Sequence, residues 1–302
     1  MIAAIDCGTN TIKLLIGDLP DVVVREARMV RLGQDVDRTG RLADDALART
    51  FAAVEEYAGL VAAHDVSRVR FCATSATRDA ANAQVFSDGV LARLGVRPEV
   101  LSGEEEAALS FAGAVRHLAG RDLLGRPDEP VLVVDVGGGS TELVLGAGEP
   151  TSAHSMDIGS VRLHERHLHD DPPTAAQVAA CVADIDAALD ASPVPIGDAA
   201  TVVGVSGTVT TVAAGVLGLP AYAREAIDQQ VLAVEDIHDL VERLVAMPVA
   251  ERLALPYMHP GRADVIDAGA LIWSRVLRRT GLTTVLVSES DILDGIAWSI
   301  SP

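Results

Sequence analysis

VLVVDVGGGSTELVLG, the stretch from Val131 to Gly146, decides the fold that we predict for this chain. An apolar run leads into Asp135, three glycines follow, and a second apolar run leaves toward Gly146. Because glycine carries no Cβ, the backbone N–H groups of such a turn can approach an anion closely. The pattern is equally compatible with an ordinary tight hairpin, so this stretch alone leaves both interpretations open.

The same pattern occurs a second time. MIAAIDCGTNTIKLLIG, at the N-terminus, aligns with the stretch without a gap, and Asp6 falls on Asp135 in this alignment. Each copy predicts a strand, an aspartate, a glycine-bearing turn and another strand, and a third strand follows at Asp21–Val30 and at Thr151–Asp157. Two acidic, amide-rich turns in one chain suggest two lobes that hold one polyanion.

Length and composition limit the architecture. A chain of 302 residues is long enough for two domains, and 49% hydrophobic with 3% aromatic residues is typical of an aliphatic α/β protein. The best predicted linker is Arg116–Pro130, which is rich in Gly, Arg, Asp and Pro. We therefore predict one lobe over residues 1–122, completed by a last helix at 291–302, and a second lobe over residues 123–290.

Charge and cysteine usage exclude several classes of function. The net charge of −19 is opposite to that of a generic nucleic-acid surface. The three cysteines are widely separated and lack C-x-x-C spacing, which disfavours zinc sites and disulfides. Cys7 lies in the first turn but has no His base beside it, so a catalytic thiol is not expected.

Neither a membrane span nor a basic leader is visible, and a cytoplasmic protein is predicted.

Two polar stretches of the first half carry arginines. TSATRDAAN, with Arg78, follows the predicted strand Arg68–Ala73, and the carboxyl ends of strands are where α/β sheets place ligands. Arg78 is therefore a candidate phosphate contact, although a surface arginine in a capping loop fits equally well. Arg31–Arg41 is polar and glycine-punctuated and is predicted to be a loop, in which solvated arginines are favoured over functional ones.

A third stretch carries carboxylates. In LSGEEEA, Ser102 can cap a helix that begins at Gly103, and the three glutamates occupy its first turn, where the helix dipole alone favours them. Glu106 has a second possible role, because it lies three residues beyond Gly103 and should lean toward the preceding strand end.

A further anion site is predicted in the second half. The strand Thr201–Val205 runs into SGTVTTVAAG, where a glycine turn opens a helix. Neither a P-loop motif nor a G-x-G-x-x-G motif is present.

Together these blocks resemble the exopolyphosphatase and guanosine pentaphosphate phosphatase (Ppx/GppA) family, within the actin-like, sugar kinase and Hsp70 superfamily. IDCGTNTIKLLIGD resembles the first phosphate motif, VVDVGGGSTELVLG the second, and VVGVSGTVTTVAA the nucleoside-side motif. TSATRDA, SGEEEA, DIGSVRL, HPGRADVIDAGA and SESDILDGI resemble supporting blocks. The resemblance covers nearly the whole chain. It implies two actin-like (ribonuclease H-like) α/β lobes with mixed five-stranded sheets and an interlobe cleft, in the short actinobacterial-type form without an HD-type C-terminal domain.

The resemblance also implies roles for individual residues. Glu106 matches the catalytic base, and Asp135 and Glu142 match the carboxylates that hold Mg²⁺ (or Mn²⁺), with Asp6 as the metal-side carboxylate of the first turn. Many members have Arg where this chain has Lys13, so at this position a compact ammonium charge replaces a planar guanidinium group with several N–H donors. The residues implied to bind phosphate are Gly8, Thr9, Asn10, Thr11, Lys13, Arg78, Gly137, Gly138, Gly139, Ser140, Thr141, Gly207 and Thr208.

The implied activity is Mg²⁺-dependent hydrolysis of the terminal phosphoanhydride of inorganic polyphosphate. A phosphatase acting on pppGpp, an ATP-dependent kinase of the superfamily, and a non-catalytic sensor of polyphosphate or alarmone stay open as alternatives. The expected partners are polyphosphate and pppGpp, with a homodimer as a further expectation and neither nucleic acid nor a membrane.

Overall fold

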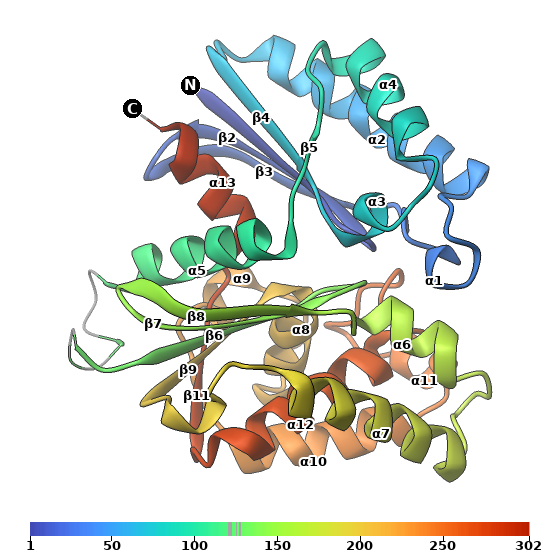
Figure 1. The fold of residues 1–302 in the computed structure, drawn as a ribbon, viewed down its shortest axis with the longest axis vertical. Coiled ribbons are helices and arrows are strands. Elements are labelled where there is room, and N and C mark those ends of the chain that lie inside the picture. Colours follow the sequence, from blue (N-terminus) through green and yellow to red (C-terminus); the bar gives the residue numbers. More distant parts are fainter. Residues whose placement is uncertain (120–122, 125, 127, 302) are drawn as a thin grey trace. The chain divides into compact units, whose positions relative to one another are not determined.

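The computed structural model describes residues 1–119, 123–124, 126 and 128–301. Its contacts divide the chain into two compact units: unit 1 is Met1–Gly113 with Ile292–Pro302, and unit 2 is Ala114–Asp291. Each unit has one mixed sheet with helices against it (Figure 1), so the α/β class predicted from the sequence is confirmed. The predicted boundary between residues 122 and 123 involves residue 122, which lies outside the described residues.

The sheet of unit 1 has the strand order β3-β2-β1-β4-β5 in the described part of the chain. β1 pairs antiparallel with β2 and parallel with β4, so the first hairpin and the later strand ends meet at one edge. The elements of unit 1 are β1 Ile2–Cys7, β2 Thr11–Asp18, β3 Asp21–Met29, α1 Val36–Thr39, α2 Asp44–Ala63, β4 Arg68–Ala73, α3 Ser75–Arg78, α4 Ala83–Leu94, β5 Glu99–Val100, the first part of α5 Gly103–Ala119, and α13 Ile292–Ile300.

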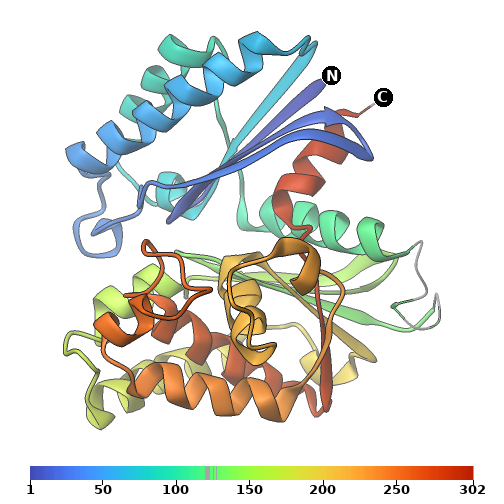
Figure 2. The ribbon, with the colours of Figure 1, turned by 180° about the vertical axis from the view of Figure 1, so that it is seen from behind.

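Side chains of β1 alternate between the two faces of this sheet. Ala3 and Ile5 belong to the core that includes α2 and α4, whereas Ile2 and Ala4 belong to the core that includes α13. By the same alternation Asp6 lies on the α13 side. Figures 1 and 2 show α13, the last helix of the chain, beside the first strand.

The sheet of unit 2 has six strands among the described residues, in the order β10-β11-β9-β6-β7-β8, and the prediction of five was wrong for this unit. The additional strand, β10, pairs antiparallel with β11. It is only three residues long and runs directly into a helix, so it shows no alternation that sequence reasoning could detect. The elements are β6 Val131–Val136, β7 Thr141–Ala147, β8 Glu149–Met156, α6 Ser160–His167, α7 Ala175–Ala191, the 3₁₀ turn η1 Ile196–Asp198, β9 Thr201–Val205, α8 Ser206–Val216, α9 Arg224–Ile227, β10 Val231–Ala233, α10 Val234–Ala246, α11 Val249–Leu253, α12 Ile266–Thr280 and β11 Thr284–Val287.

α12 is the central helix of the unit 2 core, and α6, α7, α8 and α10 all contact it. Its Trp273 is fully buried, and a Cβ on Gly204 of β9 would lie 2.8 Å from the indole ring. Glycine at this position therefore lets the largest core side chain approach the strand that leads into α8.

α5 begins in unit 1 and ends in unit 2. The sequence predicted a linker from Arg116 onward, but the helix continues to Ala119. The apolar face explains the difference, because Val115 and Leu118 are both buried and keep the helical spacing through the charged residues between them.

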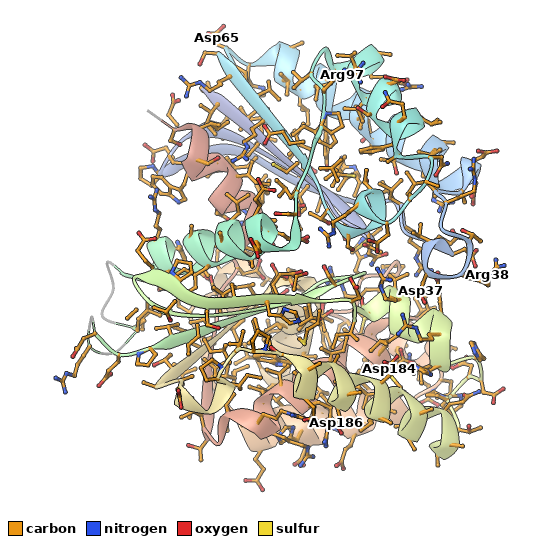
Figure 3. All side chains as sticks on the ribbon, viewed as in Figure 1. Asp37, Arg38, Asp65, Arg97, Asp184 and Asp186 are labelled. Atoms are coloured by element: carbon orange, nitrogen blue, oxygen red, sulfur yellow. The ribbon has the colours of Figure 1, made fainter. Side chains whose placement is uncertain are left out.

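Many arginines are paired with carboxylates at the surface. Asp184 and Asp186 lie on α7 (Figure 3); Asp184 accepts from Arg166 at 2.7 Å, and Asp186 pairs with Arg275 at 2.7 Å and Arg279 at 3.3 Å. Partly exposed pairs of this kind contribute up to about 1 kcal/mol each.

Within the described part of the chain, no helix combines the length and apolar character that crossing a membrane requires.

Candidate active site

The turn between β1 and β2 forms the first predicted phosphate loop. The amide of Gly8 donates to the carbonyl of Thr11 at 2.9 Å and closes the turn. Thr9 and Asn10, at its tip, are both less than one tenth exposed. The hydroxyls of Thr9 and Ser75 lie 3.0 Å apart, so α3 packs directly against this turn.

The polar segment after β3 also packs on this turn. The amides of Val30 and Arg31 both donate to the carbonyl of Asn10 at 3.0 Å, and the amide of Gly33 donates to the carbonyl of Thr9 at 2.9 Å. The predicted loop therefore begins in contact with the first turn, whereas its Arg38 and Arg41 are exposed, as the sequence predicted. Its backbone amides occupy the carbonyls of Thr9 and Asn10 in the phosphate loop.

Asp6 and Lys13 face each other across the first hairpin. They are register partners, and Lys13 Nζ lies 3.3 Å from Asp6 Oδ2. Lys13 is the only lysine in the chain. The neighbouring Cys7 is buried, and this burial together with the charge of Asp6 raises its pKa well above the ordinary value. The thiol is accordingly protonated near neutral pH and is a poor nucleophile.

The three adjacent glutamates of α5 have different surroundings. Ser102 and Glu105 form a capping box: the Ser102 amide donates to Glu105 Oε2 at 2.8 Å, and the Glu105 amide donates to the Ser102 hydroxyl at 3.2 Å. These bonds lower the pKa of Glu105. Glu104 and Glu105 are exposed, whereas Glu106 is only 8% exposed. Glu106 is thus the glutamate whose position the helix cap does not explain.

Arg78 holds the carboxylate of Glu106. Its Nη1 donates to Glu106 Oε2 at 3.0 Å and to the carbonyl of Leu101 at 2.9 Å. Because Arg78 ends α3, and α3 contacts the first turn through Ser75, these contacts connect the predicted base with the predicted phosphate loop inside unit 1. The structure therefore brings Arg78 to Glu106, a pairing that the sequence did not predict.

The turn between β6 and β7 repeats the first turn. The amide of Gly137 donates to the carbonyl of Ser140 at 3.0 Å, as Gly8 does to Thr11. A Cβ on Gly137 would lie 2.9 Å from that carbonyl oxygen, so glycine is required there. Thr141 is fully buried, and its hydroxyl donates to the carbonyl of Ile158 at 2.7 Å, which gives this side chain a supporting role.

α6 binds the carbonyl groups of this second turn. The amide of Ser160 donates to the carbonyl of Gly137 at 3.0 Å, that of Val161 to Gly138 at 2.9 Å, and Arg162 Nε to Gly139 at 2.7 Å. Among the hydrogen bonds of the described residues, none uses the amides of the turn tip as donors. The amides of Gly138, Gly139 and Ser140 can therefore donate to an anion, while α6 occupies the carbonyls of the turn.

Asp135 and Glu142 are register partners at the base of this hairpin. They are 7% and 2% exposed, and the Ser155 hydroxyl donates to Glu142 Oε1 at 2.7 Å. Two carboxylates opposite each other on paired strands repel. In the alignment of the two hairpins Glu142 corresponds to Lys13, so the first hairpin pairs an acid with a base where the second pairs two acids.

The third predicted loop contains a residue that the sequence analysis did not select. Arg262 lies directly against Gly207, because a Cβ there would be 2.1 Å from Arg262 Nη2. Its Nη1 donates to the Thr211 hydroxyl at 2.6 Å. A guanidinium group thus lies at the first turn of α8, beside Gly207 and Thr211. HPGRADVIDAGA carried no spacing that points to α8, so only the tertiary structure identifies this cation.

Tyr222 and Glu289 lie close to Arg262. The Tyr222 hydroxyl is 2.8 Å from Thr210 Oγ1 and 2.5 Å from Glu289 Oε1. Burial raises the pKa of Glu289, while the hydrogen bond from Tyr222 and the charge of Arg224 oppose the rise. The cluster gives α8 an aromatic neighbour that is 41% exposed.

The described residues contain no group of three or more His, Cys, Asp or Glu side chains placed to hold a metal ion. The predicted metal residues are distributed instead as the Asp135–Glu142 pair in unit 2 and Asp6, with its lysine, in unit 1.

Comparisons with known proteins extend over nearly the whole chain. The model of the Ppx/GppA phosphatase family matches residues 12–301. Exopolyphosphatase 2 of Mycobacterium tuberculosis is 46% identical over 320 aligned residues, covering 99% of this chain and 98% of the relative. The crystal structure of an exopolyphosphatase-like protein is 45% identical, with a TM-score of 0.94 and coverage of 99% and 98%. The Ppx/GppA family member of Aquifex aeolicus is 30% identical, with a TM-score of 0.79 and coverage of 99% and 96%.

Proposed function

The chain belongs to the Ppx/GppA phosphatase family, and from this premise we propose that it is an exopolyphosphatase, which hydrolyses the terminal phosphoanhydride bond of inorganic polyphosphate and releases orthophosphate. It is a phosphoanhydride hydrolase by family. The observation that carries the proposal is Glu106, the one buried glutamate among three neighbours, whose carboxylate Arg78 orients. The chain's 46% sequence identity to an exopolyphosphatase supports polyphosphate as the substrate.

In the proposed reaction Glu106 accepts a proton from a water molecule. The water oxygen forms a bond to the terminal phosphorus in line with the bridging oxygen, whose bond breaks, and the shortened chain leaves. General-base assistance of this kind accelerates a reaction by about 10² to 10⁴-fold. Arg78 fixes the direction of the carboxylate and places a positive charge beside the reacting groups.

In this proposal backbone amides of the two turns bind the substrate's anionic oxygens. The turn of unit 2 offers the amides of residues 138–140, and the first turn of α8 adds Arg262 beside Gly207. In unit 1 the turn of residues 9–11 and Lys13 are the corresponding donors. Such local donors offset the net charge of −19, which would otherwise repel a polyanion.

Mg²⁺ or Mn²⁺ is the proposed cofactor, and the donor set of unit 2 fits it. Asp135 and Glu142 are two buried carboxylates in register, whose mutual repulsion a bound cation would relieve, and carboxylate oxygens are the ligands that Mg²⁺ prefers. Asp6 fits less well, because Lys13 already neutralises it. When bound, such an ion neutralises phosphate charge and orients the substrate.

A guanosine pentaphosphate phosphatase is the second candidate, because the same residues would act on any terminal phosphoanhydride. The observation that favours it is Tyr222, an exposed aromatic side chain that is hydrogen-bonded to Thr210 of α8. An aromatic face beside a phosphate-binding helix terminus suits a nucleoside.

Phosphate release from short polyphosphate, long polyphosphate and pppGpp, measured in parallel with Mg²⁺, tests the proposal. We expect release from polyphosphate at a higher kcat/KM than from pppGpp. The opposite order would favour the second candidate. Binding without release would identify a sensor, and ATP-dependent transfer to an acceptor would identify a kinase; either result contradicts the proposed hydrolysis.

Replacing Gly207 with Ala tests the contribution of Arg262. The new methyl group would occupy the space of the guanidinium, which can move because it ends a flexible side chain. We expect the KM for polyphosphate to rise roughly 3- to 10-fold, as for the loss of one hydrogen-bonded contact, with little change in the melting temperature. Arg262→Ala should raise KM similarly, and the double variant should add little to either single change. Additive effects would show that Arg262 does not act at Gly207.

A further inference from the structure

Ser206 has an unusual backbone for its residue type. Its φ is 73°, at the point where β9 ends and α8 begins. This left-handed conformation is strained for L-residues with a Cβ, and it is not strained for glycine. The chain has serine at this strained position, although glycine would avoid the strain and stands at the next position, Gly207. Such an outlier is a reason to ask what the side chain does.

The hydroxyl of Ser206 extends the pairing of two strands. The parallel register of β6 and β9 ends at Asp135 and Val205. One residue further, Ser206 Oγ donates to the carbonyl of Val136 at 2.9 Å. The side chain thus replaces the backbone contact that is lost where β9 turns into the helix.

Unit 1 makes the corresponding contact with its backbone. Its parallel register runs one pair further, to Cys7 and Ala73, and the amide of Thr74 then donates to the carbonyl of Cys7 at 3.2 Å. Cys7 corresponds to Val136 in the alignment of the two hairpins. In both units the adjacent strand end therefore holds the carbonyl before the phosphate turn, through a backbone amide in unit 1 and through the serine hydroxyl in unit 2.

We propose that Ser206 is a positioning residue, whose hydroxyl fixes the first turn of α8 against the turn of residues 137–140 so that both bind one phosphate chain. The two segments meet at this bond, because Val136 leads directly into Gly137 and Ser206 directly into Gly207. The positioning role rests on the proposed function, whereas the coupling of the two segments does not.

A nucleophilic role for Ser206 is not supported. A serine at a sharp strand-to-helix turn resembles the nucleophile of some hydrolases. Here its proton is donated to a backbone carbonyl, which is not a base that could activate the oxygen. The geometry assigns the hydroxyl to holding the loops.

Ser206→Ala and Ser206→Gly separate the hydroxyl from the backbone. Both remove the bond to Val136, but only glycine relieves the strain at φ 73°. We expect both variants to raise the KM for polyphosphate by roughly 3- to 10-fold with kcat within about twofold of the wild type. The melting temperature should fall for Ser206→Ala and fall less, or rise, for Ser206→Gly. The KM would then depend on the Ser206 hydroxyl, and the melting temperature would depend on the backbone strain at residue 206.

Hydrogen exchange measured by mass spectrometry tests the coupling without any substrate. In both variants peptides that cover residues 137–141 and 206–208 should exchange faster, and peptides that cover residues 1–17 should not change. Thr151→Ala is the matched control, because it also removes a hydroxyl-to-carbonyl bond, at 3.0 Å to Leu145, on the same sheet. Its KM should stay at the wild-type value.

Two results would overturn the proposal. Unchanged exchange at both segments would show that the hydroxyl does not couple them, whatever the enzyme hydrolyses. Faster exchange with an unchanged KM would show coupling that does not position the substrate. Failure of the proposed function is recognised separately, because the wild type itself would then release no phosphate from polyphosphate.

Discussion

Glu106→Gln is expected to lower kcat for polyphosphate hydrolysis by about 10² to 10⁴-fold, the usual contribution of a general base. Glutamine has nearly the same shape, and its amide oxygen can still accept the hydrogen bond from Arg78. It cannot take a proton from water near neutral pH. Binding of polyphosphate should therefore persist, and a direct binding measurement should give a dissociation constant within a few-fold of the wild type.

The neighbouring glutamates provide matched controls in the same helical turn. Glu104→Gln alters an exposed side chain and should leave both kcat and the melting temperature unchanged. Glu105→Gln alters the capping box with Ser102 and should lower the melting temperature slightly while kcat stays near the wild-type value. Because the pKa of Glu105 is lowered in the folded protein, its contribution is present at neutral pH and is lost as the pH falls below its ordinary value of 4.5.

This series separates catalysis from the helix terminus. If all three variants lose activity to the same degree, the activity depends on the total negative charge of the first turn of α5 and not on Glu106 as a general base. Near-normal phosphate release from Glu106→Gln would remove Glu106 from the proposed mechanism altogether.

The repeated hairpins were predictable because they are local. The gapless alignment of the two copies predicted two strand pairs, and the structure places both in register, Asp6 opposite Lys13 and Asp135 opposite Glu142. β10 was missed because three residues are too short to show a period. The helical spacing of Val115 and Leu118 continued across a charged stretch that resembled a linker.

The supporting contacts of the site were not predictable from sequence patterns. Backbone amides hold the carbonyls of Thr9 and Asn10, and a backbone hydrogen bond has no residue-type signature. Arg262 reaches Gly207 only through tertiary packing. Ser206 was interpreted as the start of a glycine turn, whereas its positive φ and its bond to Val136 are properties of the folded chain. Sequence patterns thus selected the groups that we propose to act on the substrate, but not the groups that hold them in place.

Glu142→Lys is expected to abolish metal-dependent phosphate release while the protein stays folded. The first hairpin already contains this arrangement, since Lys13 pairs with Asp6 at 3.3 Å on the corresponding strands. Transferring it to the second hairpin would replace two facing carboxylates with an acid–base pair. The loss of an ion that neutralises phosphate charge removes several kcal/mol of transition-state stabilisation, so activity should fall at least about 10²-fold.

The change in stability with Mn²⁺ provides a readout that does not depend on turnover. In the wild type Mn²⁺ should raise the melting temperature, because in our proposal it binds the folded pair of Asp135 and Glu142 and not the unfolded chain. Glu142→Lys and Glu142→Gln should show no such rise. Without metal both should be at least as stable as the wild type, since each removes the repulsion between two buried carboxylates.

Two further variants locate the ion. Ser155→Ala removes only the hydrogen bond to Glu142 Oε1 and should weaken metal binding by about 10- to 100-fold, less than loss of the carboxylate itself. Asp6→Asn removes a carboxylate that Lys13 already neutralises, so the melting-temperature rise with Mn²⁺ should persist. If Asp6→Asn abolishes that rise and Glu142→Gln retains it, the ion is held in unit 1 and the assignment to the second hairpin is wrong. The opposite result would support the proposal that the second hairpin holds the metal, and would attribute this to Glu142, which stands where the first hairpin has Lys13.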